Sequence, residues 1–194
     1  SLINNYDDVA SASDAVCELV IRQFDNARAF LPALEWSVNE IIDNVFNHAC
    51  IQRPAEVYGQ YYPGKHRLEV AVVDMGRGIK ASLEEGHRVE DHREALAMAL
   101  ERGVTRSKEA GQGNGLAGTR EIVLKNGGSL RLWSGDKQYH ISKGHEAGFE
   151  NIPYTRGTGV LIKLFTDNPV DLGETFITSA ESFYIESLCE QIEQ

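Results

Sequence analysis

The stretch 36–49, WSVNEIIDNVFNHA, constrains this chain most, because it has the pattern of a helix with two chemically different faces. Apolar side chains recur at spacings of three and four residues, which is typical of a helix packed on a core. They are Val38, Ile41, Ile42, Val45 and Ala49. Glu40, Asn44 and His48 lie opposite and are four residues apart. A carboxylate, an amide and an imidazole therefore share one line along the helix.

The composition of this polar face differs from that of an ordinary solvated helix. Solvated faces are usually rich in Lys, Glu, Gln and Arg, whereas this one has no Lys or Arg and carries three Asn residues. Asn is a poor helix former, because its side chain competes for backbone hydrogen bonds. The pattern favours a functional role for the line of polar residues, and a merely solvated face is the alternative.

Length, composition and charge limit the classes of protein that fit this chain. Its 194 residues, 42% hydrophobic and 25% charged, suit one globular domain with a substantial core. No run of about eighteen apolar residues and no signal peptide is visible, so we expect a soluble protein with no membrane segment. Three widely spaced cysteines favour a reduced cytoplasmic compartment over a disulfide framework or a zinc site. The net charge of -10 argues against a nucleic-acid partner.

The remaining sequence alternates helical and strand patterns. A first helix of about fifteen residues has Asp7, Ser11 and Ser13 as candidate N-caps. The Leu31-Pro32 pair ends or resets it, because the residue before proline avoids the helical region. Strand patterns lie over 57–62, 67–73, 130–134, 139–142 and 160–165. Turns are predicted at 63–65 and 135–137, and the stretch after 142 is irregular. Further helices are predicted over 91–102, 116–125 and a C-terminal segment capped by Thr178 and Glu181.

Three glycine motifs follow the central helix. Asp74-x-Gly76-x-Gly78 comes directly after the apolar strand 67–73. Gly111-x-Gly113-x-Gly115 precedes the helix 116–125, where backbone amides and the helix dipole converge on one point. Gly157-Thr158-Gly159 leads into the last strand. Each motif alone is more often a turn than a binding site, but their order and spacing along the chain are more specific.

Together with Glu40-x-x-x-Asn44, these motifs resemble the GHKL superfamily, the ATP-binding domain shared by DNA gyrase, the ninety-kilodalton heat-shock chaperone, histidine kinases and the mismatch-repair protein MutL. The similarity covers residues 12 to 165. It implies an α/β fold, an α+β two-layer sandwich known as the Bergerat fold, with a mixed and mostly antiparallel sheet, helices on one face and an ATP lid. We expect an ATP-binding domain over 1–166 with its lid at 80–114. Residues 167–194 would be a linker and helix that begin a further domain or pack on the first.

The resemblance also implies roles for individual residues. Asn44 would hold the magnesium ion that bridges the phosphates of ATP, which suits a metal that prefers oxygen ligands. Asp74 would accept a hydrogen bond from the adenine amino group, and Lys108, with Arg102 and Arg106, would neutralise phosphate charge. A solvated basic helix end is the alternative for these three cations. The expected ATP contacts are Asn44, Asp74, Gly76, Gly78, Lys108, Gly111, Gly113, Gly115, Leu116 and Thr158.

Glu40 distinguishes the branches of the superfamily. A glutamate here activates the attacking water in gyrase-like and chaperone-like members, and it is proposed to activate a protein hydroxyl in anti-sigma-factor kinases, whose helix motif is nearest. Val45 and Met75 depart from the residues that many members have at those places. We expect a magnesium-dependent ATPase or ATP-dependent serine/threonine-type protein kinase of a bacterial regulatory protein, with Glu40 as catalytic general base. His48 is expected to support the site rather than to contact phosphate.

Two other functions stay open. The chain could be a nucleotide-gated protein-interaction module with little or no turnover, or its glycines could all be structural turns, in which case it has no nucleotide affinity. The segment 173–182, GETFITSAES, is similar to the start of a STAS-like domain. That similarity suits a protein partner, either STAS-like or a phosphorylation substrate, and a homodimer is also left open.

Overall fold

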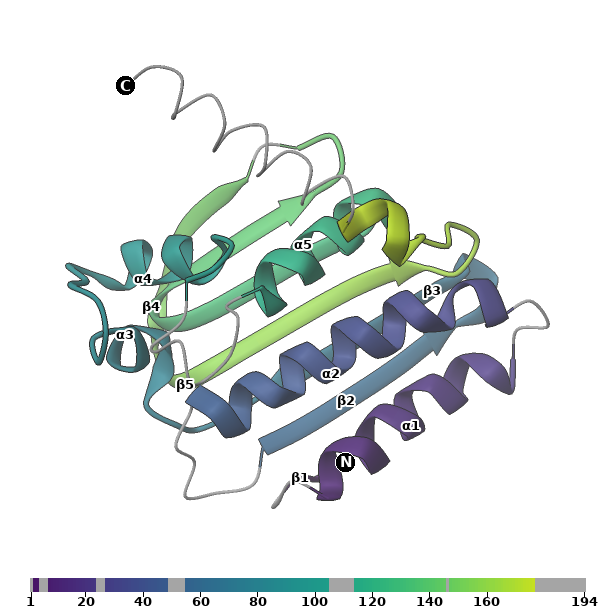
Figure 1. The fold of residues 1–194 in the computed structure, drawn as a ribbon, viewed down its shortest axis with the longest axis horizontal. Coiled ribbons are helices and arrows are strands. Elements are labelled where there is room, and N and C mark those ends of the chain that lie inside the picture. The colour runs from purple at the N-terminus through teal and green to yellow at the C-terminus, as the bar shows by residue number, and fades with distance from the viewer. Residues whose placement is uncertain are drawn as a thin grey trace.

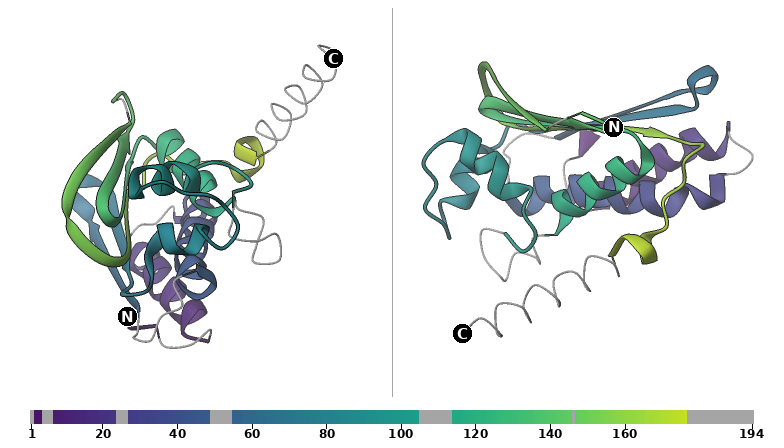
Figure 2. Two further views of the ribbon diagram at one scale, coloured as in Figure 1. Left: turned by 90° about the vertical axis from the view of Figure 1, so that its left-hand side faces the viewer. Right: turned by 90° about the horizontal axis from the view of Figure 1, so that it is seen from above.

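A computed structural model of the chain shows one sheet with helices against one of its faces, as Figures 1 and 2 show from three directions. The predicted α/β sandwich is therefore confirmed. The residues that the structure describes are 2–3, 7–23, 27–48, 55–104, 114–145 and 147–176. Across this part of the chain, no helix combines the length and the apolar character that crossing a membrane requires.

The sheet has the strand order β1-β2-β3-β5-β4, and each of its four pairings is antiparallel. The outermost strand β1 is only two residues long. The strands are β1 (Leu2–Ile3), β2 (Ala55–Tyr62), β3 (Arg67–Val73), β4 (Ser129–Ser142) and β5 (Gly148–Phe165). A short 3-10 helix, η2 (Pro63–Lys65), connects β2 to β3 at the predicted turn. β3 lies between β2 and β5, so the turn after it is fixed at the centre of the sheet.

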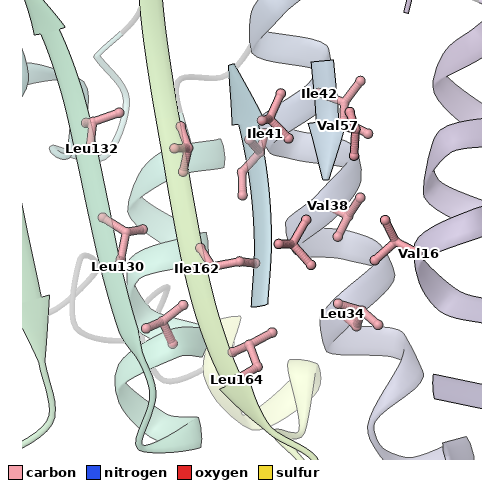
Figure 3. Close-up of a cluster of buried hydrophobic side chains, with 14 of the residues drawn as sticks. Val16, Leu34, Val38, Ile41, Ile42, Val57, Leu130, Leu132, Ile162 and Leu164 are labelled. Carbon is pink, nitrogen blue, oxygen red and sulfur yellow. The ribbon is translucent and has the colours of Figure 1, made fainter. Parts of the chain in front are cut away.

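Alternation along the strands places one row of side chains in the core. β3 has buried residues at every second position, as expected for a strand with only one covered face. Figure 3 shows the buried side chains of the sheet facing those of the helices. The largest fully buried strand residues are Leu68, Leu130, Leu132, Ile162 and Leu164. On the helix side, Leu34, Val38, Ile41 and Ile42 are between 0% and 2% exposed. The described part of the predicted apolar stripe, Val38, Ile41 and Ile42, is therefore on the core face of its helix.

Among the described residues, the three longest helices pack against the sheet. They are α1 (Asp7–Ile21), α2 (Leu31–His48) and α5 (Gly115–Asn126). The predicted central helix is α2, and it begins at Leu31 because Pro32 is tolerated in a first turn, where its missing N–H would have no partner. α1 starts at Asp7, so Ser11 and Ser13 lie inside the helix and the prediction of them as N-caps was wrong. α5 ends at the left-handed Gly127, as the Asn-Gly-Gly sequence indicates.

The long hairpin β4–β5 differs from the prediction. Residues 135–137 were expected to form a turn between two strands, but β4 runs through them and pairs with β5 on both sides. The register shifts at Ser134/Gly135 and Gly135/Lys137, so this Gly-Asp-Lys sequence is a bulged part of one strand. Much of the stretch predicted to be irregular before Gly157 also belongs to β5.

The segment predicted as a polar lid contains more structure than expected. Besides α4 (His92–Ala99), it holds α3 (Gly78–Leu83), which the sequence pattern did not indicate. Asp91 caps α4 by accepting a hydrogen bond from Glu94 N at 2.8 Å, so the helix begins after Asp91. The two helices share a small apolar cluster built on Leu83, Val89 and Ala95. This part of the segment is therefore a packed unit. It is attached to the sheet because α4 contacts β4.

Some predictions fall on residues outside those described. They include the glycines Gly111 and Gly113, the cations Arg106 and Lys108, the side chains of Val45 and His48, Cys50 and Cys189, and the C-terminal helix with Thr178 and Glu181. Residues 114–115 at the end of the lid are described. The Asn114 Oδ1 atom accepts a hydrogen bond from Gly103 N at 3.3 Å, which joins the end of the α4 segment to the start of α5.

Candidate functional site

The polar line of α2 is the first part of the candidate site. Asn44 Nδ2 donates a hydrogen bond to the Glu40 backbone oxygen at 2.7 Å. A backbone carbonyl can only accept, so this bond fixes the orientation of the amide and leaves Asn44 Oδ1 as the atom that can take a ligand. Magnesium prefers such an oxygen. Asn44 thus fits the metal-binding role that the sequence predicted for it.

Two half-buried carboxylates lie together on this face. Burial raises the pKa of Glu40, and the negative charge of Asp43 raises it further. Burial also raises the pKa of Asp43, whose Oδ1 atom is buried without a hydrogen-bond partner among the described residues. A carboxylate with a raised pKa holds a proton more strongly, which is what a general base requires. Glu40 and Asp43 are therefore two neighbouring carboxylates whose pKa values are both raised.

The Asp74 turn is the second part of the site. Asp74 is 4% exposed, and its Oδ1 atom accepts a hydrogen bond from Gly76 N at 2.6 Å. Burial raises the pKa of Asp74, while the backbone N–H groups of Gly76 and Thr158 partly oppose that shift. Asp74 N donates to Thr158 O at 2.9 Å. The turn is thereby tied to β5, and a carboxylate with two oxygens has acceptor capacity left for a ligand donor.

Close backbone packing holds this turn in place. Gly157 has a φ of +83°, and a Cβ atom there would lie 2.8 Å from Asp74 Oδ1. Gly78, with a φ of +80°, approaches Ser134, since a Cβ atom would lie 2.7 Å from Ser134 Oγ. That hydroxyl donates to Gly157 O at 2.8 Å and accepts from Ile79 N at 3.0 Å. One buried serine therefore connects the segment after Asp74 to both β4 and β5.

The start of α5 meets the polar face of α2. Gly115 is the first residue of α5, and a Cβ atom there would overlap Glu40 Oε2. The backbone of Gly115 therefore lies directly against the Glu40 carboxylate. Figure 1 shows the C-terminal ends of α2 and β3 and the N-terminal end of α5 at the same end of the sheet, beside α3. Residues far apart in the chain are gathered there.

The other predicted contact residues have varied surroundings. Thr158 is half-buried, and its backbone oxygen binds the Asp74 turn. Leu116 packs against the main core cluster. Arg102 Nε donates to Glu121 Oε1 at 3.1 Å, so this cation is paired with a carboxylate of α5. Gly76 is buried within the Asp74 turn. Lys108, Gly111 and Gly113 are the predicted contacts that lie outside the described residues.

Two polar residues of the site were not predicted. Asp43 lies three residues after Glu40, and its position beside Asn44 in the sequence E-x-x-D-N is the signal that could have identified it. Ser134 has no comparable signal, because its role depends on β4, β5 and α3 meeting at one point. Among the described residues, no group of three or more His, Cys, Asp or Glu side chains forms a cation site. A magnesium ion here would need oxygen ligands from Asn44 and from phosphates.

The described residues form an α/β sandwich, an antiparallel sheet covered by helices on one face. One helix carries an amide and a carboxylate, and a buried Asp lies at the end of a central strand. The family model for histidine kinase-, DNA gyrase B- and HSP90-like ATPases matches residues 32–167. The chain belongs to this family. It is thereby an ATP-binding domain of the GHKL superfamily, and the predicted superfamily is confirmed. No curated protein matches the chain.

Solved structures that match include a histidine kinase domain and a domain of a DNA repair protein. The histidine kinase domain of the Erythrobacter litoralis EL346 blue-light activated histidine kinase is 15% identical, with a TM-score of 0.39, and the match covers 81% of this chain and 60% of that one. The N-terminal domain of a DNA repair protein is 17% identical, with a TM-score of 0.37, and the match covers 97% of this chain and 49% of that one. This chain thus matches 60% or less of the length of either structure.

Proposed function

We propose that the chain binds ATP with magnesium at the end of the sheet where α2, β3 and α5 meet, and that Glu40 acts there as a general base. The observation that carries this proposal is the contact of the Glu40 carboxylate with Gly115 at the start of α5, one helical turn from the amide oxygen of Asn44. The base, the metal ligand and a helix N-terminus are then in one place. Helix N-termini favour phosphate.

Each residue has a distinct role in this proposal. Asn44 Oδ1 would hold magnesium, which would offset the negative charge of the phosphates. Asp74 accepts a hydrogen bond from the adenine amino group, and Thr158 lies close to the adenine. Gly76 and Gly78 allow the backbone to approach the adenine ring. The phosphates lie against the lid residues that come before α5 and against its first turn. These lid and helix residues are Lys108, Gly111, Gly113, Gly115 and Leu116.

Glu40 removes the proton of the attacking group. That group is water in ATP hydrolysis or the hydroxyl of a protein substrate in a kinase reaction, and both need the same proton acceptor. The raised pKa of Glu40 brings it closer to neutral pH, where a general base is most effective. The protein would serve as the nucleotide-dependent part of a cytoplasmic bacterial regulator that acts on a protein partner, STAS-like or phosphorylated. Residues 1–166 would be the ATP-binding domain.

The test is ADP formation from ATP and magnesium, which hydrolysis and transfer to a protein both produce, with and without candidate partner proteins, in wild type and in Glu40→Gln. We expect the variant to bind ATP nearly as wild type does and to lose about a hundredfold or more in turnover, because a positioned general base contributes that much. Glu35→Gln is the matched control, since Glu35 is an exposed carboxylate on the same helix. Equal turnover in wild type and Glu40→Gln would make Glu40 a surface carboxylate.

The second candidate function is a nucleotide-gated interaction module with little turnover. It is favoured by the packing of residues 170–176, which follow the part matched by the family model, against α2 and α5. A segment attached to the helices of the site can transmit nucleotide occupancy without any chemistry. Absence of ADP formation with every candidate partner, combined with tight ATP binding, would favour this function.

A further inference from the structure

The segment 166–176 is fastened to the end of α5 by a compact network of hydrogen bonds. Asn126 is 1% exposed, and its side chain accepts from Phe165 N at 2.7 Å and donates to Phe165 O at 2.8 Å. It also donates to Asn168 O at 2.5 Å, while Asn168 Nδ2 donates back to Asn126 O at 3.0 Å. The chain that leaves β5 is therefore held in a defined place on the helical layer.

From this anchor the segment continues over α2 and α5. Val170 is buried in a second apolar cluster with Ala33 of α2 and Ile122 of α5, which is separate from the main core. The Phe176 ring packs against Trp36 of α2, with ring centroids 4.9 Å apart and planes inclined at 48°. Aromatic pairs at this distance contribute beyond simple burial. The segment thus bridges the two helices that form the candidate site.

Glycines allow α2 and α5 to approach closely at this bridge. A Cβ atom on Gly118 would lie 2.9 Å from Trp36 Cζ3 and 3.1 Å from Phe176 Cε1. Gly115, three residues earlier in α5, touches Glu40, which is four residues after Trp36 in α2. The two contacts are therefore one helical turn apart on both helices. A change in the separation of α2 and α5 at Trp36 also changes the distance between Glu40 and Gly115, because a packed helix moves as a unit.

We propose that Trp36 and Phe176 are a positioning pair that couples the segment after the ATPase domain to the nucleotide site. The pair sets the separation of α2 and α5, and through it the placement of the Glu40 carboxylate against the start of α5. This inference rests on the proposed function of Glu40. Whatever pulls on or releases the chain at Phe176 then alters catalysis, and a ligand that moves the start of α5 alters the surroundings of Trp36.

The experiment uses the full chain with five substitutions at four positions in α2, α5 and the segment. Phe176→Ala removes the ring, and Phe176→Tyr keeps it. Gly118→Ala pushes a methyl group into Trp36, although alanine is a better helix residue than glycine and would otherwise stabilise α5. Trp36→Phe removes the outer ring atoms that this methyl group meets, so the double variant Gly118→Ala/Trp36→Phe relieves the overlap. Val170→Ala is the control, because it thins the same cluster without changing either ring of the pair.

We expect Phe176→Ala and Gly118→Ala to lower kcat about tenfold to a hundredfold, since displacements near 1 Å have effects of that size. The ATP dissociation constant should stay within about threefold, because Asn44 and Asp74 are not touched. Phe176→Tyr and the double variant should recover most of the lost kcat, and Val170→Ala should keep it. A loss in Val170→Ala as large as in Phe176→Ala, or no recovery in the double variant, would overturn the coupling.

Tryptophan fluorescence provides a measurement that does not need turnover. The chain has two tryptophans, so Trp133→Phe leaves Trp36 as the single reporter. ATP should change its emission, and adding Phe176→Ala should remove that change while ATP still binds. If wild type binds ATP without turnover, the proposed role of Glu40 as a base fails. The ATP-dependent change in Trp36 emission then decides by itself whether Phe176 is coupled to the nucleotide site. No ATP binding in wild type refutes both proposals. ATP binding without any change in Trp36 emission, in every variant, refutes only the coupling.

Discussion

Replacing Asp74 by Asn tests the adenine contact most directly, because the change is nearly isosteric. The asparagine oxygen can still accept the hydrogen bond from Gly76 N that Asp74 Oδ1 accepts at 2.6 Å. The turn should therefore keep its shape. The second carboxylate oxygen becomes an NH₂ group, and this donor would face the adenine amino group, which is also a donor. Asp74→Asn should thus remove ATP recognition and leave the fold intact.

The size of the loss follows from the burial of the site. A hydrogen bond to a charged group contributes about 1.5 to 3 kcal/mol, and a buried donor left unpaired costs about 1 to 3 kcal/mol more. Asp74 is 4% exposed, so water cannot replace the lost partner. A combined loss of about 3 kcal/mol or more lowers the affinity for ATP at least about a hundredfold. Calorimetric titration with a non-hydrolysable ATP analogue measures it, and Asp136→Asn on β4 is the control.

The same substitution should not destabilise the protein without nucleotide. Burial raises the pKa of Asp74 in the folded state, so the stability linked to its protonated form is present below about pH 4 and is lost as the pH rises through the folded pKa. Asparagine carries no charge and avoids that loss. Thermal unfolding at neutral pH should therefore give an equal or higher Tm for Asp74→Asn than for wild type, with the difference shrinking toward about pH 4. Unchanged ATP affinity, or a lower Tm accompanying lost affinity, would refute the reasoning.

Three further predictions concern the metal, the lid and the backbone at the site. Asn44→Ala should weaken ATP binding about tenfold or more in magnesium, through the lost charged contact, and an equal loss in excess chelator would contradict the metal role. ATP with magnesium should protect the segment 80–114 from trypsin, and identical cleavage with and without the analogue would argue against a lid. Gly157→Ala should lower stability by about 1 to 3 kcal/mol and weaken ATP binding, because its φ of +83° and the nearby Asp74 oxygen leave no room for a methyl group; a wild-type Tm would disprove this.

Local signals explain why much of the fold was predictable. The apolar stripe of α2 repeats at the period of a helix, so periodicity alone identified both the helix and its core face. The strand before Asp74 is apolar and ends in a glycine turn, which placed a polar group at the end of a central strand. Helix α5 is bounded by glycines on both sides, and its predicted range is within one residue of the observed one.

Long-range pairing explains what could not be predicted. The residues 135–137 have turn chemistry, but β5 continues alongside them, and Gly135 with a φ of +65° absorbs the bulge instead of reversing the chain. Likewise Leu83, Val89 and Ala95 lie in α3, in the connection after it and in α4, so no periodicity within one helix links them and only their meeting in space reveals the packed α3–α4 unit. Ser134 enters the site by the same route, since its two hydrogen bonds reach residues 23 and 55 positions away. Sequence patterns carry no signal for such contacts.

Gly118 shows how a local cost indicates a non-local role. A glycine inside a helix is less stable than alanine by about 1 kcal/mol, so sequence reasoning treats it as a weak point of α5. In the structure it lies under the Trp36 and Phe176 rings, where any larger residue would separate α2 from α5. Positions that break a local rule are expected where another requirement outweighs it. Here that requirement is the close crossing of two helices one turn from Glu40, and the glycine is the residue that permits it.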